Sequence, residues 1–181
     1  MTPTLFQRLL GAEFYYLAPE VKALHARQGR FRYEGRFSVE RGRNPLGRLA
    51  GALMRLPPAM TDAPITVEFD AGGAKETWLR GFGGKPMRSR LSFDNGQLRE
   101  RLGPATFHFR LCRIDSDLHW VAERARMFGI LPVPASWLDE VRCREHDDDG
   151  RYGFEVEARL PLLGRLVRYH GWLMPVAAND D

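Results

Sequence analysis

The stretch that decides the fold is MRSRLSFDNGQLRERL, residues 87–102. Leu91 and Phe93 stand two positions apart with polar neighbours between and beside them, which is typical of a β-strand with one buried face. Asp94-Asn95-Gly96 follows, and Asn-Gly favours the positive-φ backbone of a tight hairpin turn. The alternation then resumes at Leu98. The stretch therefore predicts two antiparallel strands joined by a short turn.

The same two-residue period extends over most of the chain. Short turn sequences such as Gly72-Gly73, Asp115-Ser116-Asp117 and Asp148-Asp149-Gly150 separate the alternating runs, and short connections join antiparallel neighbours. Roughly nine consecutive strands, each apolar on one side, are more than a flat sheet accommodates, so we expect a curled meander that forms a barrel or half-barrel. The other alternating runs are residues 31–39, 65–69, 78–82, 107–111, 118–124, 152–160 and 167–173.

Two or three short helices should lie near the start of the chain. Thr2-Pro3, Pro19 and Asn44-Pro45 are helix-opening signals, since proline suits the first helical position. The third helix should bury an amphipathic face and end before Pro57-Pro58. The predicted fold class is α+β, mainly β, with a single domain over residues 1–178 and a polar tail over 179–181. The apolar face of the third helix comprises Leu46, Leu49, Ala50, Leu53 and Met54.

Charge and cysteine usage exclude some functions. The net charge is +4, but the arginines are dispersed among Asp and Glu rather than clustered, so we expect no nucleic-acid binding. No segment has the length and hydropathy of a transmembrane helix, and no signal peptide is visible. Alternation puts Cys112 and Cys143 on faces of different polarity, which argues against a disulfide. We therefore expect a cytoplasmic protein.

Motifs for catalysis or cofactors are not supported by their context. Gly81-Phe82-Gly83-Gly84-Lys85-Pro86 resembles a phosphate loop, but it lacks the Ser or Thr after Lys and the following helix. The histidines have no metal-ligand spacing, and we expect each of them, His25 included, at the surface or half-buried. We predict no cofactor and no metal.

Several polar residues fall on the apolar phase of their strands. β-Bulges that reverse the phase, or buried Arg–Glu pairs, would explain them structurally. Alternatively, they line a partly wet cavity inside the curled sheet, where arginine would favour a carboxylate or phosphate head group. The candidate ligand-binding residues are Arg41, Arg80, Ser89, Glu100, Arg124, Glu145 and Tyr169.

Two connections are unusually apolar, residues 127–134 and 160–164. We expect them to cover the open end of the barrel and to fold over the N-terminal helices. Exposed apolar tips would instead indicate a rim that docks on a partner or touches a membrane.

Six further segments are distinctive: LFQRLLG (5–11), VERGR (39–43), FGG (82–84), ERLGP (100–104), LPLLG (160–164) and YHGWL (169–173). Together they resemble a family of uncharacterised bacterial domains found alone or C-terminal to reductase domains similar to saccharopine dehydrogenase. The resemblance implies no catalytic residues, because that family has no established activity. It implies a reductase as a partner, although this chain has no dinucleotide-binding fingerprint.

The leading hypothesis is a non-catalytic module that binds an apolar or amphipathic small molecule in a curved-sheet cavity. One alternative is an enzyme of unrecognised type that uses Glu100 or Glu145 as a buried general acid or base. Another is an accessory domain that docks on a reductase, in which case side chains should fill the cavity.

Overall fold

The computed structural model of the protein describes residues 2–53, 56–82, 85–161 and 164–177. The predictions that fall on Met54, on residues 83–84 and 162–163, and on the tail at 179–181 lie outside these residues.

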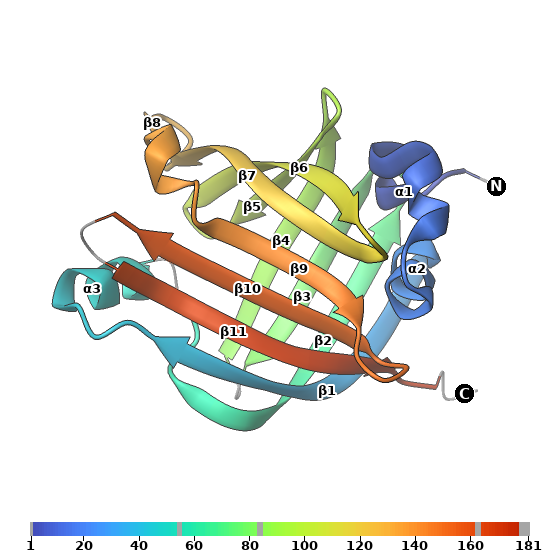
Figure 1. The fold of residues 1–181 in the computed structure, drawn as a ribbon, viewed down its shortest axis with the longest axis horizontal. Helices are drawn as coiled ribbons and strands as arrows, with labels where there is room; N and C mark the ends of the chain where they lie inside the picture. The colour runs from blue at the N-terminus through green and yellow to red at the C-terminus, as the bar shows by residue number, and fades with distance from the viewer. Residues whose placement is uncertain (1, 54–55, 83–84, 162–163, 178–181) are drawn as a thin grey trace.

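Within the described residues, ten antiparallel strands close into one barrel (Figure 1). Each strand of the ring pairs with its neighbour in sequence, and β7 pairs with both β6 and β9. The prediction of a curled meander is confirmed, and of its two forms the structure has the closed barrel. The ring strands are β1 (Gly29–Arg41), β2 (Met60–Gly72), β3 (Lys75–Phe82), β4 (Lys85–Asp94), β5 (Gln97–Leu102), β6 (Ala105–Ile114), β7 (Asp117–Met127), β9 (Val141–Asp147), β10 (Tyr152–Leu160) and β11 (Gly164–Pro175).

The N-terminal helices cover one end of the barrel (Figure 1). They are α1 (Leu5–Leu10), the 3₁₀ helix η1 (Gly11–Tyr16) and α2 (Pro19–Ala26). A capping box of Thr4 and Gln7 starts α1, two residues later than the Thr2-Pro3 signal predicts. Phe6 of α1 and Val21 of α2 are fully buried against the barrel, so the helices seal this end with their apolar faces.

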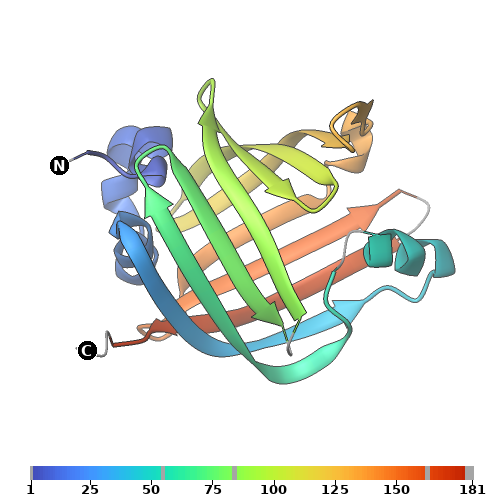
Figure 2. The ribbon, with the colours of Figure 1, turned by 180° about the vertical axis from the view of Figure 1, so that it is seen from behind.

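Helix α3 (Pro45–Leu53) lies between β1 and β2, at the end of the barrel away from α1 and α2 (Figures 1 and 2). Asn44 caps it by accepting a hydrogen bond from the backbone N–H of Leu46 at 2.9 Å. The helix is therefore where the sequence predicts it. The expected burial of its apolar face is wrong for Leu46 and Leu49, which are 64% and 68% exposed.

The connection after β7 contains the two-residue strand β8 (Leu131–Pro132) and the 3₁₀ helix η2 (Ala135–Trp137). Phe128, Ile130 and Leu131 are exposed there, and the connection lies opposite the N-terminal helices (Figure 1). The expectation that residues 127–134 fold over those helices is therefore wrong. Leu138, just beyond η2, is buried in the core and helps to close the barrel wall where β7 and β9 part.

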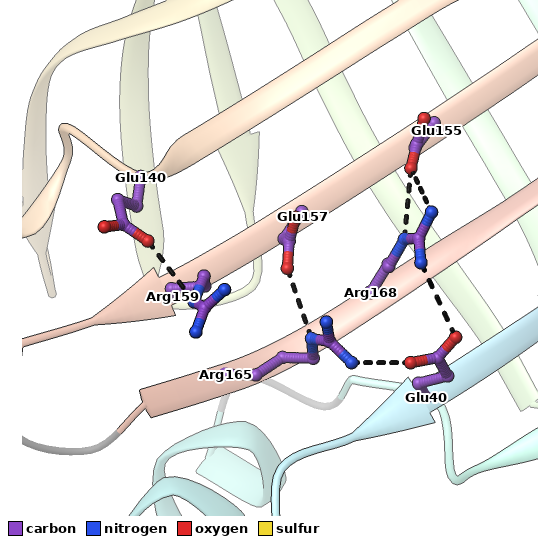
Figure 3. Close-up of polar contacts among 7 residues, drawn as sticks. All are labelled: Glu40, Glu140, Glu155, Glu157, Arg159, Arg165 and Arg168. Carbon is purple, nitrogen blue, oxygen red and sulfur yellow. Dashed lines mark hydrogen bonds and ion pairs between the residues drawn. The ribbon is translucent and has the colours of Figure 1, made fainter.

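The barrel closes where β1 meets β11, along a ladder from Tyr33↔Pro175 to Arg41↔Val167. On its outer face, cross-strand ion pairs link three strands (Figure 3). Arg168 contacts Glu155 at 2.6 Å and Glu40 at 3.8 Å, and Arg165 contacts Glu40 at 2.6 Å. These side chains are partly exposed, so each pair contributes less than about 1 kcal/mol. The pairs nevertheless favour the observed register, because a shift of β11 would separate them.

None of the helices in the described part of the chain is long and apolar enough to cross a membrane.

Candidate ligand-binding cavity

The barrel encloses a cavity of about 320 Å³. Its wall is mainly aromatic and aliphatic, with side chains from β2, β3, β4, β5, β6, β7, β9, β10 and β11. Phe107 and Phe109 are part of it, so these aromatic residues of β6 face inward. A volume of this size lies within the range of small-molecule pockets.

Arg80 is the centre of a polar cluster in the cavity wall. Its guanidinium donates a hydrogen bond to the hydroxyl of Ser89 at 2.5 Å and lies 3.8 Å from a carboxylate oxygen of Glu100. The guanidinium also stacks over the ring of Trp78, 4.9 Å from its centroid. Arg80 and Glu100 line the cavity, while Ser89 is fully buried behind them. Because Glu100 neutralises Arg80, this cluster presents hydrogen-bonding groups but little net charge.

A second polar cluster, the floor, lies at the helical end of the barrel; of its ionisable residues His25, Glu76 and Glu145, only Glu145 lines the cavity. His25 of α2 shares a hydrogen bond of 2.6 Å between its Nε2 and Oε2 of Glu145 on β9, and both residues are almost fully buried. Phe6 stacks on the His25 ring at 3.6 Å between centroids. The carboxylate of Glu76 accepts a hydrogen bond from the indole of Trp78 at 2.9 Å. The floor therefore joins a helix to the barrel through a buried polar contact.

Arg142 also lines the cavity and is charged, whereas two phenols and a thiol of the wall stay neutral at physiological pH. Burial raises the pKa of the phenol of Tyr152 well above its usual 10, and the negative charge of Glu145 adds to the effect. Burial likewise raises the pKa of Tyr169, although the charge of Arg80 opposes it. Burial, reinforced by Glu145, also raises the pKa of the Cys143 thiol. A thiol kept protonated is a poor nucleophile, so this wall is suited to binding rather than to covalent chemistry.

The indole N–H of Trp120 is a buried donor in the cavity wall. Trp120 is 3% exposed, and its Nε1 has no hydrogen-bond partner within the described part of the chain. An unsatisfied buried donor costs about 1–3 kcal/mol.

Of the seven predicted site residues, the structure brings five together. Arg80, Glu100, Glu145 and Tyr169 line the cavity, and Ser89 holds Arg80 in place. The prediction for Arg124 is wrong, because a β-bulge opposite His108 and Phe109 reverses the phase of β7. Arg124 is exposed on the outer face, where it donates to the side chain of Gln97 at 2.7 Å.

Arg41 lies apart from the central cluster. It is the last residue of β1 and lines a second pocket near α3 rather than the barrel cavity. Its position on the inner phase of β1 is as predicted, but it lies at the end of the barrel away from Glu145.

Two residues of the floor were not identified from the sequence. His25 is fully buried rather than half-buried or at the surface, so that expectation is wrong. His25 shares the inward face of α2 with Val21 and Leu24, and this helical spacing could have predicted that it is buried. Glu76 continues the phase of Trp78 and Arg80, which was a usable signal for its inward orientation. The two predicted free cysteines are confirmed.

The fold and the site define a closed antiparallel barrel with an apolar internal cavity that carries a few enclosed polar groups. The chain belongs to the family described as "Domain of unknown function (DUF4166)", whose model matches residues 17–173. Among curated proteins, none matches the sequence. Among solved structures, the chain is similar to one titled "Crystal Structure of Rv2717c from M. tuberculosis". The two are 13% identical, with a TM-score of 0.44, and the match covers 89% of this chain and 99% of that one.

Proposed function

We propose that this protein is a non-catalytic binding module for an apolar or amphipathic small molecule, which it holds inside the barrel. The observation that carries the proposal is the cavity of about 320 Å³, walled by aromatic and aliphatic side chains around a few polar groups. Burial of apolar ligand surface stabilises a complex by roughly 25 cal/mol per Å² before the entropic costs of binding. The alternative of a docking domain with a filled interior fits this cavity poorly.

The polar groups supply orientation. Arg80 and Glu100 neutralise each other, so they suit a neutral hydrogen-bonding group of the ligand. A polar group that meets these partners binds in one orientation, because any other orientation leaves buried donors unpaired.

The reductase partner that the sequence resemblance implies remains a prediction. It would suit a module that holds a hydrophobic metabolite for another enzyme. Co-purification of a reductase with the tagged protein, lost when the barrel is unfolded by mutation, would support it.

The test of the binding function is native mass spectrometry of protein purified without detergent, together with an organic extract of the same sample. We expect a reproducible bound species of defined mass. The matched variants are Ala158→Phe, which adds a ring to the cavity wall, and Val121→Phe, which adds a ring on the partly exposed side of β7. Ala158→Phe should lose the species and Val121→Phe should keep it.

Equal retention of the species in both variants would contradict binding inside the barrel. Turnover of the extracted compound that depends on pH and disappears in Glu145→Gln would favour the enzyme alternative instead, since Glu145 is the buried carboxylate at the cavity floor.

A further inference from the structure

A second pocket, of about 520 Å³, opens beside α3 at the end of the barrel away from the N-terminal helices. Leu56, Phe82 and Met87 line both this pocket and the barrel cavity. The two spaces therefore adjoin at these three side chains, and a single molecule that occupies both has to pass beside them.

Two arginines line the second pocket, Arg41 from the end of β1 and Arg48 from α3. Among the described residues that line it, none is acidic. Neither arginine forms an ion pair with another described residue, and the one polar side-chain contact of Arg41 is a 3.5 Å hydrogen bond to the carbonyl oxygen of Pro57. Two cations that face one pocket without a counter-charge favour an anion between them.

The environment of Arg41 supports the same conclusion. Burial lowers the pKa of its guanidinium, and the positive charge of Arg48 lowers it further. A bound anion would reverse this second effect, since an opposite charge nearby stabilises the charged form of arginine.

Arg80 is a poorer candidate for the head group than Arg41 and Arg48. Arg80 lies inside the cavity but already has Glu100 and Ser89 as partners. A second carboxylate or phosphate at Arg80 would bring two negative charges together in a poorly solvated space, which is unfavourable. The second pocket has no such competitor among the residues described.

We propose that Arg41 and Arg48 bind the anionic head group, phosphate or carboxylate, of a single-chain amphiphile whose apolar chain lies in the barrel cavity. This inference rests on the proposed function, because it requires that the cavity accept an apolar chain. It assigns the class of ligand and the direction in which the ligand lies, with its head at the α3 end and its tail towards His25.

Gly51 of α3 provides an independent way to disturb the head-group site. A Cβ atom at Gly51 would lie 1.8 Å from Nη2 of Arg41, so Gly51→Ala must displace the guanidinium. The backbone of Gly51 has no left-handed conformation to preserve, and alanine favours a helix over glycine by up to about 1 kcal/mol. We therefore expect the variant to move the guanidinium of Arg41 while α3 remains helical.

The experiment is isothermal titration calorimetry with three probes: dodecyl phosphate, 1-dodecanol and inorganic phosphate. We expect dodecyl phosphate to bind at least about tenfold more tightly than dodecanol, since a charge-assisted contact contributes more than about 1.4 kcal/mol. Arg41→Gln, Arg48→Gln and Gly51→Ala should each weaken dodecyl phosphate about tenfold and leave dodecanol unchanged. Arg43→Gln is the matched control, because Arg43 is exposed, lies outside the pocket and carries the same charge.

The outcomes separate this inference from the proposed function. If dodecyl phosphate and dodecanol bind equally and the arginine variants change nothing, the head-group site is overturned while the cavity remains a binding site. If neither twelve-carbon probe binds to the wild-type protein, the proposed function fails as well. If inorganic phosphate binds as tightly as dodecyl phosphate, the arginines bind free anions and the apolar chain contributes nothing. The proposal of one ligand that occupies both pockets is then overturned.

Discussion

At the scale of single residues, the contact between His25 and Glu145 matters most for the stability of the fold. Both side chains are nearly inaccessible, and their 2.6 Å hydrogen bond joins α2 to β9 across the cavity floor. Removal of one member would leave the other buried without its partner, which is strongly destabilising. Glu145 therefore has a structural role in addition to lining the cavity, and its replacement by alanine tests stability before it tests binding.

Glu76, in the same cluster, should make the stability of the protein depend on pH. Burial raises the pKa of its carboxyl above the usual 4.5, partly offset by the charge of His25 and the hydrogen bond from Trp78. The folded state then holds this proton more tightly than the unfolded state, so ionisation of Glu76 reduces the free energy of unfolding as pH rises above about 4.5. Glu76→Gln removes this dependence. Urea denaturation at a series of pH values should show the wild type losing stability relative to Glu76→Gln as the pH increases from 4 to 7.

Glu155→Gln is the control for that experiment because its sign is opposite. The hydrogen bond from Arg168 lowers the pKa of Glu155, so its stabilising effect is present above about 4.5 and is lost as the pH falls. The effect is small, since Glu155 is partly exposed. A stability difference between wild type and Glu76→Gln that does not vary with pH would contradict the prediction.

At this scale the sequence predicts which residues point inward but not which of them meet. Two-residue alternation placed Arg80, Glu100, Glu145 and Tyr169 correctly, because their strands are regular where these residues lie. It failed for Arg124, because the extra residue of a β-bulge leaves no mark in the hydrophobic pattern. The partnership of His25 with Glu145 joins residues 120 positions apart, which no local pattern contains.

At the scale of secondary-structure elements, two glycines allow the closing strands β1 and β11 to approach each other closely. A Cβ atom at Gly35 of β1 would lie 1.8 Å from the carbonyl oxygen of Trp172, and one at Gly171 of β11 would lie 2.2 Å from that of Arg36. Backbone atoms cannot move aside as a flexible side chain can. The two strands therefore approach each other too closely for any larger residue at these positions.

Gly35→Ala should accordingly destabilise the protein by about 1–3 kcal/mol, the range for overpacking in a tightly packed region. Gly81→Ala is the matched control in β3, since its Cβ atom would lie an ordinary 3.6 Å from the nearest atom, the carbonyl oxygen of Thr66. Chemical denaturation of both variants provides the comparison. Equal stability of the two would show that β1 and β11 have more room between them than the structure indicates.

The secondary-structure elements themselves were largely predictable from local chemistry. Proline after a capping residue marked α3, and Asn-Gly or Asp-rich turns marked the hairpins. The connection that holds β8 and η2 was missed as structure, because its apolar residues carry no period. The outward orientation of Leu46 and Leu49 was also not predictable, since amphipathicity indicates a buried face only when a partner surface is present.

At the scale of the whole molecule, the two ends of the barrel differ. The helices α1 and α2 close one end, and α3 lies at the other (Figure 1). The arginine pocket lies beside α3. Whether the meander closes at all was not decided by the sequence, because closure depends on strand tilt and stagger rather than on alternation.

Occupation of the cavity should raise the thermal stability of the molecule as a unit, because a ligand that binds only the folded barrel shifts the unfolding equilibrium. At a free concentration of 100 times Kd, the gain is about 2.7 kcal/mol. For a domain of this size, that corresponds to an increase in Tm of roughly 5–10 °C. Differential scanning calorimetry with dodecyl phosphate should show it for the wild type and not for Ala158→Phe. An equal rise in both proteins would indicate binding to the outer surface.

The ladder between β1 and β11 also has a consequence for the order of events during synthesis. It pairs residues 33–41 with residues 167–175, so the wall of the cavity is incomplete until the final strand has left the ribosome. A nascent chain that ends before Gly164 leaves β1 and β10 with unpaired edges, which are sites for aggregation. Binding inside the barrel therefore requires that β11 has been made, and nascent chains stalled before that strand should bind nothing and depend on chaperones.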